Sequence, residues 1–178
     1  MTILFNSLPL SSESLRAIKE CGYETPTPVQ AGVLPIALET GDLLVQSQTG
    51  TGKTAAFMLP LIEKLSGSTK IGALVLTPTR ELAVQVAQEG TQLAKYHSLK
   101  ICTIYGGVAF DPQITRSQTS QILVGTPGRV LDHLKRRTID IYFINDKFIL
   151  WTSYSVLRCC LLDTTYLVFV WLDCKFIS

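Results

Sequence analysis

The sequence predicts an α/β fold in which a mostly parallel β-sheet is covered by helices on both faces. Three observations lead to this prediction. Over residues 1–141, short apolar runs alternate with amphipathic segments. A glycine-bearing loop at residues 47–54 joins one apolar run directly to an amphipathic segment, as strand–loop–helix units do. The length of 178 residues fits one domain with one ordinary core.

Composition narrows the class of protein. Apolar residues make up 47% and charged residues 17%, as in globular proteins. The net charge of +2 neither requires nor excludes a nucleic-acid partner. The sequence lacks both a membrane-length apolar run and a secretory signal, so we expect no membrane association and a cytoplasmic or nuclear location. The five cysteines are then reduced thiols, and no Cys/His spacing suggests a structural metal.

The N-terminal elements are expected in the following order. Ser11 or Ser12 caps a helix that runs to about residue 21. Residues 23–28 contain two prolines and should form an extended connection, because a residue before proline avoids the helical conformation. A second helix is expected at residues 29–38, and the apolar residues 43–46 are typical of a short buried strand.

Helices and strands then alternate as far as residue 135. Amphipathic spacing predicts helices that begin at Lys53, at Arg80 (to about residue 94) and at Gly128 (to about residue 135). Short apolar runs predict strands at residues 73–76, 101–105 and 122–124.

The loop after the first expected strand carries the clearest chemical signal. It reads Ser47-Gln48-Thr49-Gly50-Thr51-Gly52-Lys53-Thr54, which matches the Gly-Lys-Thr end of a phosphate-binding loop, with serine where the general pattern has glycine. Glycines let backbone N–H groups turn toward phosphate oxygens, and the following helix adds its positive dipole end. Lysine supplies a charge to the outer phosphates, and the threonine hydroxyl suits Mg²⁺. The alternative is a chance glycine loop between a strand and a helix.

A second cluster precedes this loop. Residues 22–30 read Gly-Tyr-Glu-Thr-Pro-Thr-Pro-Val-Gln, with Phe5 seventeen positions upstream of the glycine. Taken alone, the cluster is equally well explained as a proline-rich turn that leads into a helix.

Together with three later segments, these motifs resemble the DEAD-box RNA helicases. The later segments are Pro78-Thr79-Arg80-Glu81-Leu82-Ala83, Gly106-Gly107 and Thr126-Pro127-Gly128-Arg129, and all five motifs occur in that family's order. The resemblance covers residues 1–141 and implies an incomplete RecA-like domain of the P-loop NTPase class. It also implies ATP hydrolysis coupled to RNA strand separation or to remodelling of RNA–protein complexes.

The resemblance assigns the nucleotide-binding residues one by one. Tyr23, Thr25 and Gln30 would bind adenine, because a glutamine amide offers both the donor and the acceptor that an adenine edge needs. Ser47, Gln48, Thr49, Gly50, Thr51, Gly52, Lys53 and Thr54 would bind the phosphates of ATP or ADP. Lys53 and Thr54 would be central to catalysis, with Thr54 holding the Mg²⁺ that accompanies ATP.

The RNA contacts are assigned in the same way. Pro78, Thr79, Arg80, Gly106, Gly107, Thr126, Pro127, Gly128 and Arg129 would hold the backbone of a single RNA strand. Hydroxyls, glycine amides and Arg guanidinium groups suit phosphate and 2′-hydroxyl contacts, which carry little sequence information. Without the resemblance, Arg80 and Glu81 are better explained as a solvated first helical turn, and residues 126–128 as a tight turn. The run from His133 to Arg137 is better explained as a solvated helix end than as an RNA contact.

Residues 142–178 differ from the rest of the chain. They contain no Gly, Pro, Ala, Glu or Gln, and no Asp-Glu-Ala-Asp motif or other adjacent acidic pair. Asp146 could imitate the metal-binding aspartate, but Lys147 stands where the second acid should be. We therefore predict that residues 1–141 form a partial helicase domain and that residues 142–178 are an aberrant apolar tail. In this interpretation the chain is a truncated product of a longer helicase. Each prediction has an alternative. For the tail, residues 166–172 fill the vacant strand position in the sheet. For the activity, the chain binds ATP or ADP and RNA without turnover.

Overall fold

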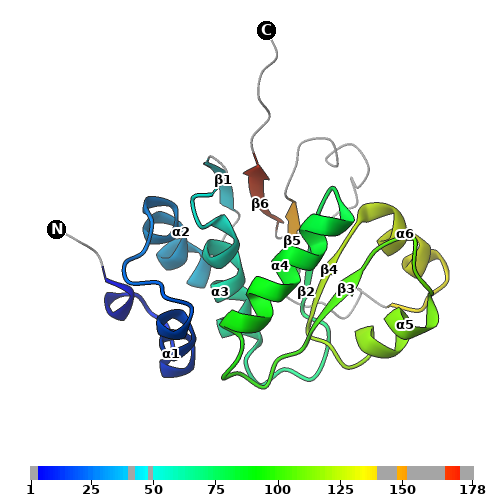
Figure 1. Ribbon diagram of the computed structural model, residues 1–178, viewed down its shortest axis with the longest axis horizontal. Coiled ribbons are helices and arrows are strands. Elements are labelled where there is room, and N and C mark those ends of the chain that lie inside the picture. The colour runs from blue at the N-terminus through cyan, green and yellow to red at the C-terminus, as the bar shows by residue number, and fades with distance from the viewer. Residues whose placement is uncertain (1–3, 40–42, 48–49, 140–147, 152–166, 173–178) are drawn as a thin grey trace, which may run out of the picture.

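A parallel β-sheet forms the centre of the molecule. The computed structural model describes residues 4–39, 43–47, 50–139, 148–151 and 167–172. Within these residues the sheet has six strands in the order β1-β6-β5-β2-β4-β3, and every pair is parallel (Figure 1). The strands are β1 Leu43–Ser47, β2 Ala73–Leu76, β3 Ile101–Ile104, β4 Ile122–Gly125, β5 Phe148–Trp151 and β6 Leu167–Leu172.

Helices connect β1 to β2, β2 to β3 and β3 to β4, as a parallel sheet requires. These are α3 (Lys53–Leu65), α4 (Arg80–Leu93) and α5 (Asp111–Ser117), and α6 (Pro127–Lys135) follows β4. The short 3₁₀ turn η1 (Phe5–Ser7), α1 (Ser12–Glu20) and α2 (Pro28–Leu38) precede β1. Local sequence sets their beginnings: Ser11 caps α1 by accepting a hydrogen bond from the Ser14 backbone N–H, and Thr27 caps α2 in a capping box with Gln30.

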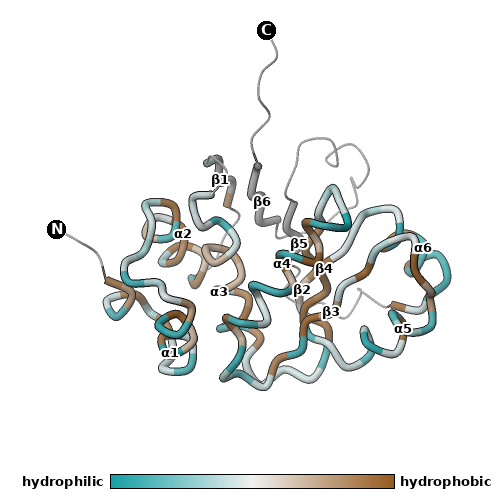
Figure 2. Tube along the Cα trace, in the orientation of Figure 1, coloured by the Kyte–Doolittle hydropathy of each residue, from teal (hydrophilic) through white to brown (hydrophobic). Residues whose placement is uncertain are grey.

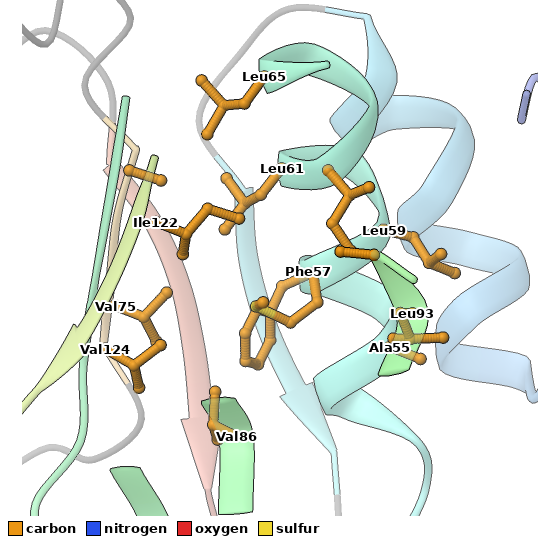
Figure 3. Packing of buried hydrophobic residues seen from close by; sticks show 14 of the residues in the cluster. Ala55, Phe57, Leu59, Leu61, Leu65, Val75, Val86, Leu93, Ile122 and Val124 are labelled. Carbon is orange, nitrogen blue, oxygen red and sulfur yellow. The ribbon is translucent and has the colours of Figure 1, made fainter. Parts of the chain in front are cut away.

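Alternate residues of the strands face two separate apolar layers. Ala73 and Val75 of β2 pack with Val124 of β4 against α3 and α4, where Phe57 and Leu61 fill the interface (Figure 3). Leu74 and Leu76 of β2 face the opposite layer, which includes Cys102, Ile104, Leu123 and Val130. Figure 2 shows the resulting hydrophobic strip along β2 and β4. The predicted α/β fold with helices on both faces of a parallel sheet is therefore confirmed.

Most expected elements agree with the structure to within one or two residues. Three were missed: η1, α5 and β5. Helix α5 contains a single aliphatic residue, Ile114, so no apolar periodicity announces it.

Two strands come from the segment beyond residue 141. β6 lies between β1 and β5, which agrees with the alternative that residues 166–172 occupy a strand position in the sheet. Asp146 and Lys147 lie outside the described residues. The expected division of the chain at residue 141 stays a prediction.

The expected solvated helix end at residues 133–137 is wrong for one residue. Lys135, Arg136 and Arg137 are exposed, but the His133 side chain is fully buried. It lies on the inner face of α6, because that face continues from buried Val130.

Candidate functional site

The phosphate-type loop connects the C-terminal end of β1 to the start of α3. Gly50 and Gly52 have φ values of 77° and 78°, which only glycine adopts without strain. Lys53 is buried, and its Nζ donates a hydrogen bond of 2.5 Å to the Ser47 carbonyl at the end of β1. The Ser47 and Thr51 hydroxyls are 2.9 Å apart. The lysine therefore folds over the loop, while Gln48 and Thr49 lie outside the described residues.

The segment at residues 22–30 docks directly on this loop. The Thr27 hydroxyl donates to the Thr51 carbonyl at 2.8 Å, and Gln30 Nε2 donates to the Gly52 carbonyl at 3.1 Å. Gln30 Oε1 accepts from the Thr27 backbone N–H at 2.9 Å. A Cβ on Gly52 would lie 2.5 Å from Gln30 Nε2, so a side chain at position 52 would displace the Gln30 amide from its bond to the Gly52 carbonyl. The two sequence motifs thus form one hydrogen-bonded unit.

Gln30 has a structural role that the sequence did not reveal. Its side chain is 3% exposed and already uses one amide hydrogen and one oxygen lone pair within the protein. A glutamine amide has two donors and two acceptor sites, so one of each remains. The residue can therefore support the loop and still present a donor and an acceptor to a ligand.

The two motifs enclose a pocket of about 600 Å³. The predicted nucleotide residues that line it are Tyr23, Thr25, Gln30, Gly50, Gly52, Lys53 and Thr54, and they are joined by Gly22, Glu24, Thr27 and Glu89. This volume is typical of small-molecule pockets in proteins.

Glu89 reaches the pocket from α4 and was not found from the sequence. Its Oε1 accepts a hydrogen bond of 3.1 Å from the Tyr23 hydroxyl. Burial, together with the negative charge of Glu89, raises the pKa of Tyr23 to about 12. The tyrosine is therefore neutral at physiological pH. The two residues are 66 positions apart, so no spacing rule in the sequence links them.

The second set of predicted residues lies on the loops that follow β2, β3 and β4. These strands are neighbours and parallel, so their C-terminal ends meet at one edge of the sheet. The Thr77 N–H donates to the Gly125 carbonyl and the Thr126 N–H to the Ile104 carbonyl, both at 2.9 Å. These bonds tie the three loops together. Pro78, Thr79, Arg80, Gly106, Gly107 and Gly128 are exposed there, and Thr126, Pro127 and Arg129 are half-buried.

Two arginines of this set are held by aromatic rings. The Arg80 guanidinium lies 4.8 Å from the ring centre of Tyr105, and Arg129 lies 4.6 Å from that of Phe110. Arg129 also donates to the Val108 carbonyl at 3.0 Å. Gly107 has φ of 82°, and a Cβ there would lie 3.8 Å from Arg80 Nη1. Ordered cations and exposed backbone groups therefore share one surface, which we call the arginine edge (residues 78–80, 106–107 and 126–129).

Helix α4 connects the two sets of residues. Thr79 caps it by accepting a hydrogen bond of 3.2 Å from the Leu82 N–H, and Arg80 is its first residue. Glu89, further along the same helix, lines the pocket. A displacement of α4 would therefore change both the pocket and the arginine edge.

Two further observations concern metal binding and membrane-spanning helices. Among the described residues, no cluster of three His, Cys, Asp or Glu side chains is arranged to hold a metal ion. Nor does any helix in the described part of the chain have the length and apolar character to cross a membrane.

The parallel sheet, the phosphate-type loop and the pocket beside it define a RecA-like protein of the P-loop class. The pattern of the DEAD/DEAH box helicase family matches residues 27–149. The chain therefore belongs to the DEAD/DEAH box helicase family. The match ends eight residues beyond the boundary predicted at residue 141.

Curated relatives agree with this assignment. A probable ATP-dependent RNA helicase of Methanocaldococcus jannaschii is 47% identical over 148 residues, which is 80% of this chain and 40% of that protein. The DEAD-box ATP-dependent RNA helicase CshA of Bacillus subtilis is 46% identical over 147 residues, which is 82% of this chain and 30% of that protein. The chain thus spans less than half the length of these relatives.

Solved structures have the same fold. A DEAD box protein from Methanococcus jannaschii superposes with a TM-score of 0.84 at 40% identity, covering 93% of this chain and 49% of that one. Dbp5 of S. cerevisiae bound to RNA and ADP BeF3 gives a TM-score of 0.81 at 26% identity, covering 94% of this chain and 46% of that one.

Proposed function

We propose that this chain is the ATP-binding and RNA-contacting part of a DEAD-box ATP-dependent RNA helicase. The observation that carries the proposal is the single pocket that joins the 22–30 segment to the phosphate-type loop. Family membership and relatives named ATP-dependent RNA helicases support it. The reaction is hydrolysis of ATP coupled to separation of RNA strands or remodelling of RNA–protein complexes.

The pocket suits an adenine nucleotide. Tyr23 offers a ring for stacking and Gln30 a spare donor and acceptor for the base edge. A guanine edge reverses the donor–acceptor order, so adenine should be preferred. At the other end of the pocket, Lys53 would exchange the Ser47 carbonyl for phosphate oxygens. Backbone N–H groups at the start of α3 would add to the binding of the phosphates.

Thr54 is the residue that suits Mg²⁺. It lines the pocket next to Lys53, at the first turn of α3, where its hydroxyl can join phosphate oxygens as a ligand. When bound, Mg²⁺ neutralises charge that develops on the phosphates.

The arginine edge suits single-stranded RNA. Its cations, hydroxyls and exposed glycine amides would contact phosphates and 2′-hydroxyls, so binding should depend on salt and little on sequence. Helix α4 gives nucleotide and RNA a shared element, because it carries Arg80 at one site and Glu89 at the other.

One specific observation favours a second function, which is binding without turnover. Residues 142–178 contain no adjacent acidic pair to hold Mg²⁺ and orient the attacking water. RNA-stimulated phosphate release, compared with Lys53→Ala, separates the two functions. Turnover above that control supports the helicase reaction, and equal rates support binding alone.

The nucleotide proposal is tested by titrating the chain with ADP and with GDP. We expect ADP to bind more tightly, and Gln30→Ala to reduce the preference. The matched control is Gln113→Ala. Gln113 is equally buried and also bridges two backbone groups, the Tyr105 N–H at 3.1 Å and the Ala109 carbonyl at 2.9 Å, but it lies outside the pocket.

The two variants separate recognition from support. Both should lose a similar amount of stability, because each loses two internal hydrogen bonds. Only Gln30→Ala should change the ratio of the GDP and ADP dissociation constants. Equal affinity of the wild-type chain for ADP and GDP would contradict the proposed adenine site.

A further inference from the structure

A cluster around Phe110 lies beside the arginine edge. Phe110 precedes α5 and follows the Gly106-Gly107 loop. Its ring centroid is 4.1 Å from that of His133 on α6, and the Arg129 and Arg136 guanidinium groups lie 4.6 and 4.3 Å from the Phe110 ring centre. Residues 129 and 133 of α6 and its C-cap residue 136 are spaced by four and three, so one side of the helix and its C-terminal end surround a single ring.

His133 is held in one orientation. The Thr138 hydroxyl oxygen lies 2.8 Å from His133 Nδ1 and 3.1 Å from the His133 carbonyl oxygen, which also accepts from the Thr138 backbone N–H at 3.0 Å. His133 Nε2 is buried and has no hydrogen-bond partner within the described part of the chain. Burial and the nearby Arg129 lower the pKa of His133, which keeps the ring neutral between the two arginines.

The cluster joins two segments of the arginine edge that are distant in sequence. Arg129 donates to the Val108 carbonyl, one residue past Gly107, and also lies against Phe110. The loop is fixed from its other side by Gln113, whose side chain bonds Tyr105 and Ala109. The Phe110 ring contacts Arg129 and His133 of α6 and Arg136 at the end of that helix.

From this arrangement we infer that Phe110 and His133 are positioning residues for RNA binding. They hold Arg129 and the Gly106-Gly107 loop in fixed relative positions before RNA arrives. The inference rests on the proposed function. Immobilising a long side chain costs free energy at the moment of binding, so an arginine that is already ordered binds more tightly. Neither residue needs to touch RNA for this effect.

The test is a titration of fluorescently labelled single-stranded RNA with the full chain, followed by anisotropy. Phe110→Ala should weaken RNA binding by about fivefold, the cost expected when one long side chain must be ordered on binding. Phe110→Tyr keeps the ring and should restore most of the affinity. His133→Ala removes the second ring of the pair and should also weaken RNA binding, whereas His133→Phe keeps a ring against Phe110 and should restore most of the affinity.

Tyr96→Ala is the matched control. The Arg16 guanidinium lies 3.9 Å from the Tyr96 ring centre, so this variant also removes a ring beneath an arginine. Tyr96 follows the end of α4, near the start of β3 and thus at the opposite edge of the sheet from Arg129. It should leave RNA affinity unchanged. ADP affinity measured on every variant reports whether the nucleotide site is intact.

Hydrogen exchange supplies a readout that loss of stability alone would not produce. In Phe110→Ala, the Tyr105 amide, which donates to Gln113 Oε1, and the Gln113 and Ile114 amides, which donate to the Phe110 carbonyl, should exchange faster. The Ala56 amide, which donates to the Gly52 carbonyl, should keep the wild-type rate. Faster exchange throughout the chain, or RNA affinity of Phe110→Ala equal to that of the wild-type chain, would overturn the inference. If the wild-type chain binds no RNA, the RNA part of the proposed function fails and the inference fails with it.

Discussion

Gly125, at the end of β4, allows unusually close contact between two strands. A Cβ at this position would lie 2.5 Å from the Ile104 carbonyl oxygen of β3 and 2.9 Å from Val130 Cγ2. The same Ile104 carbonyl accepts the hydrogen bond from the Thr126 N–H. Gly125→Ala therefore forces two paired strands apart at the point where the 126–129 segment begins.

The cost follows from what the new methyl group meets. Overpacking a filled site costs about 1–3 kcal/mol, and loss of the Thr126–Ile104 hydrogen bond adds about 1 kcal/mol. We expect a total of about 2–4 kcal/mol. In a chain of this size each kcal/mol lowers Tm by about 2–4 °C, so Tm should fall by roughly 5–15 °C.

Gly90→Ala provides the comparison that tests the reasoning. A Cβ at Gly90 would lie only 2.1 Å from Met58 Cε and 2.9 Å from Ile101 Cδ1, which is nominally a worse clash. Both atoms are the ends of flexible side chains, and alanine gains about 1 kcal/mol over glycine within a helix. Gly90→Ala should thus cost less than Gly125→Ala by at least about 1 kcal/mol.

Thermal unfolding followed by circular dichroism measures both variants. Gly128→Ala is the control without a clash, because a Cβ there meets no atom within 4 Å. The position lies in α6, so this variant should be stabilised by up to about 1 kcal/mol. If Gly90→Ala proves as destabilising as Gly125→Ala, the distinction between backbone and side-chain neighbours is refuted.

Three further changes have expected outcomes. The pKa of Tyr23 is raised from 10 to about 12, so the stability that this shift contributes is fully present below pH 10 and is lost as the pH rises to 12. Tyr23→Phe should remove this slope in alkaline unfolding curves. The pKa of His133 is lowered in the folded chain, so as the pH falls the unfolded chain binds a proton at this residue before the folded chain does. The free energy of unfolding should therefore decrease below pH 6.5, and His133→Phe should reduce this decrease in acid unfolding. Ser11→Ala removes the cap of α1 and a 2.8 Å hydroxyl bond to Glu63; it should cost about 1–2 kcal/mol in urea unfolding, and no change in midpoint would refute the capping argument.

Local signals were sufficient for most of the fold. A continuous apolar run predicted β2 with its observed bounds, because both faces of a strand in a parallel sheet are buried. The Ser11 and Thr27 caps mark helix starts that sequence can predict. Helix α5 was not predicted because it has one aliphatic residue and is held by the side-chain hydrogen bonds of Gln113 instead of by an apolar face.

The site was predicted less completely than the fold, for a physical reason. The phosphate-type loop is contiguous, so its glycines and Lys53 could be found by spacing alone. The supporting contacts join distant positions, such as Tyr23 with Glu89 and Phe110 with His133. Pairs of this kind depend on how strands are ordered in the sheet, and strand order is not encoded in any short window of sequence.

Strand order also gives the segment beyond residue 141 a consequence for nucleotide binding. Among the described residues, β1 pairs only with β6, so the strand that carries the phosphate-type loop is joined to the sheet by residues 167–172. Phe169 pairs with Leu44 of β1 and with Trp151 of β5. Proline in a central strand removes a ladder N–H. Phe169→Pro should therefore weaken ADP binding.

The matched control places proline in a strand that does not contact β1. Thr103→Pro should leave ADP affinity close to that of the wild-type chain, because β3 pairs with β4 at the opposite edge of the sheet from β1. RNA affinity should fall less than ADP affinity in Phe169→Pro, since the arginine edge is built on β2, β4 and β3, away from β6. If Phe169→Pro binds ADP as tightly as the wild-type chain, β1 holds the loop without β6, and the segment beyond residue 141 is dispensable for the nucleotide site.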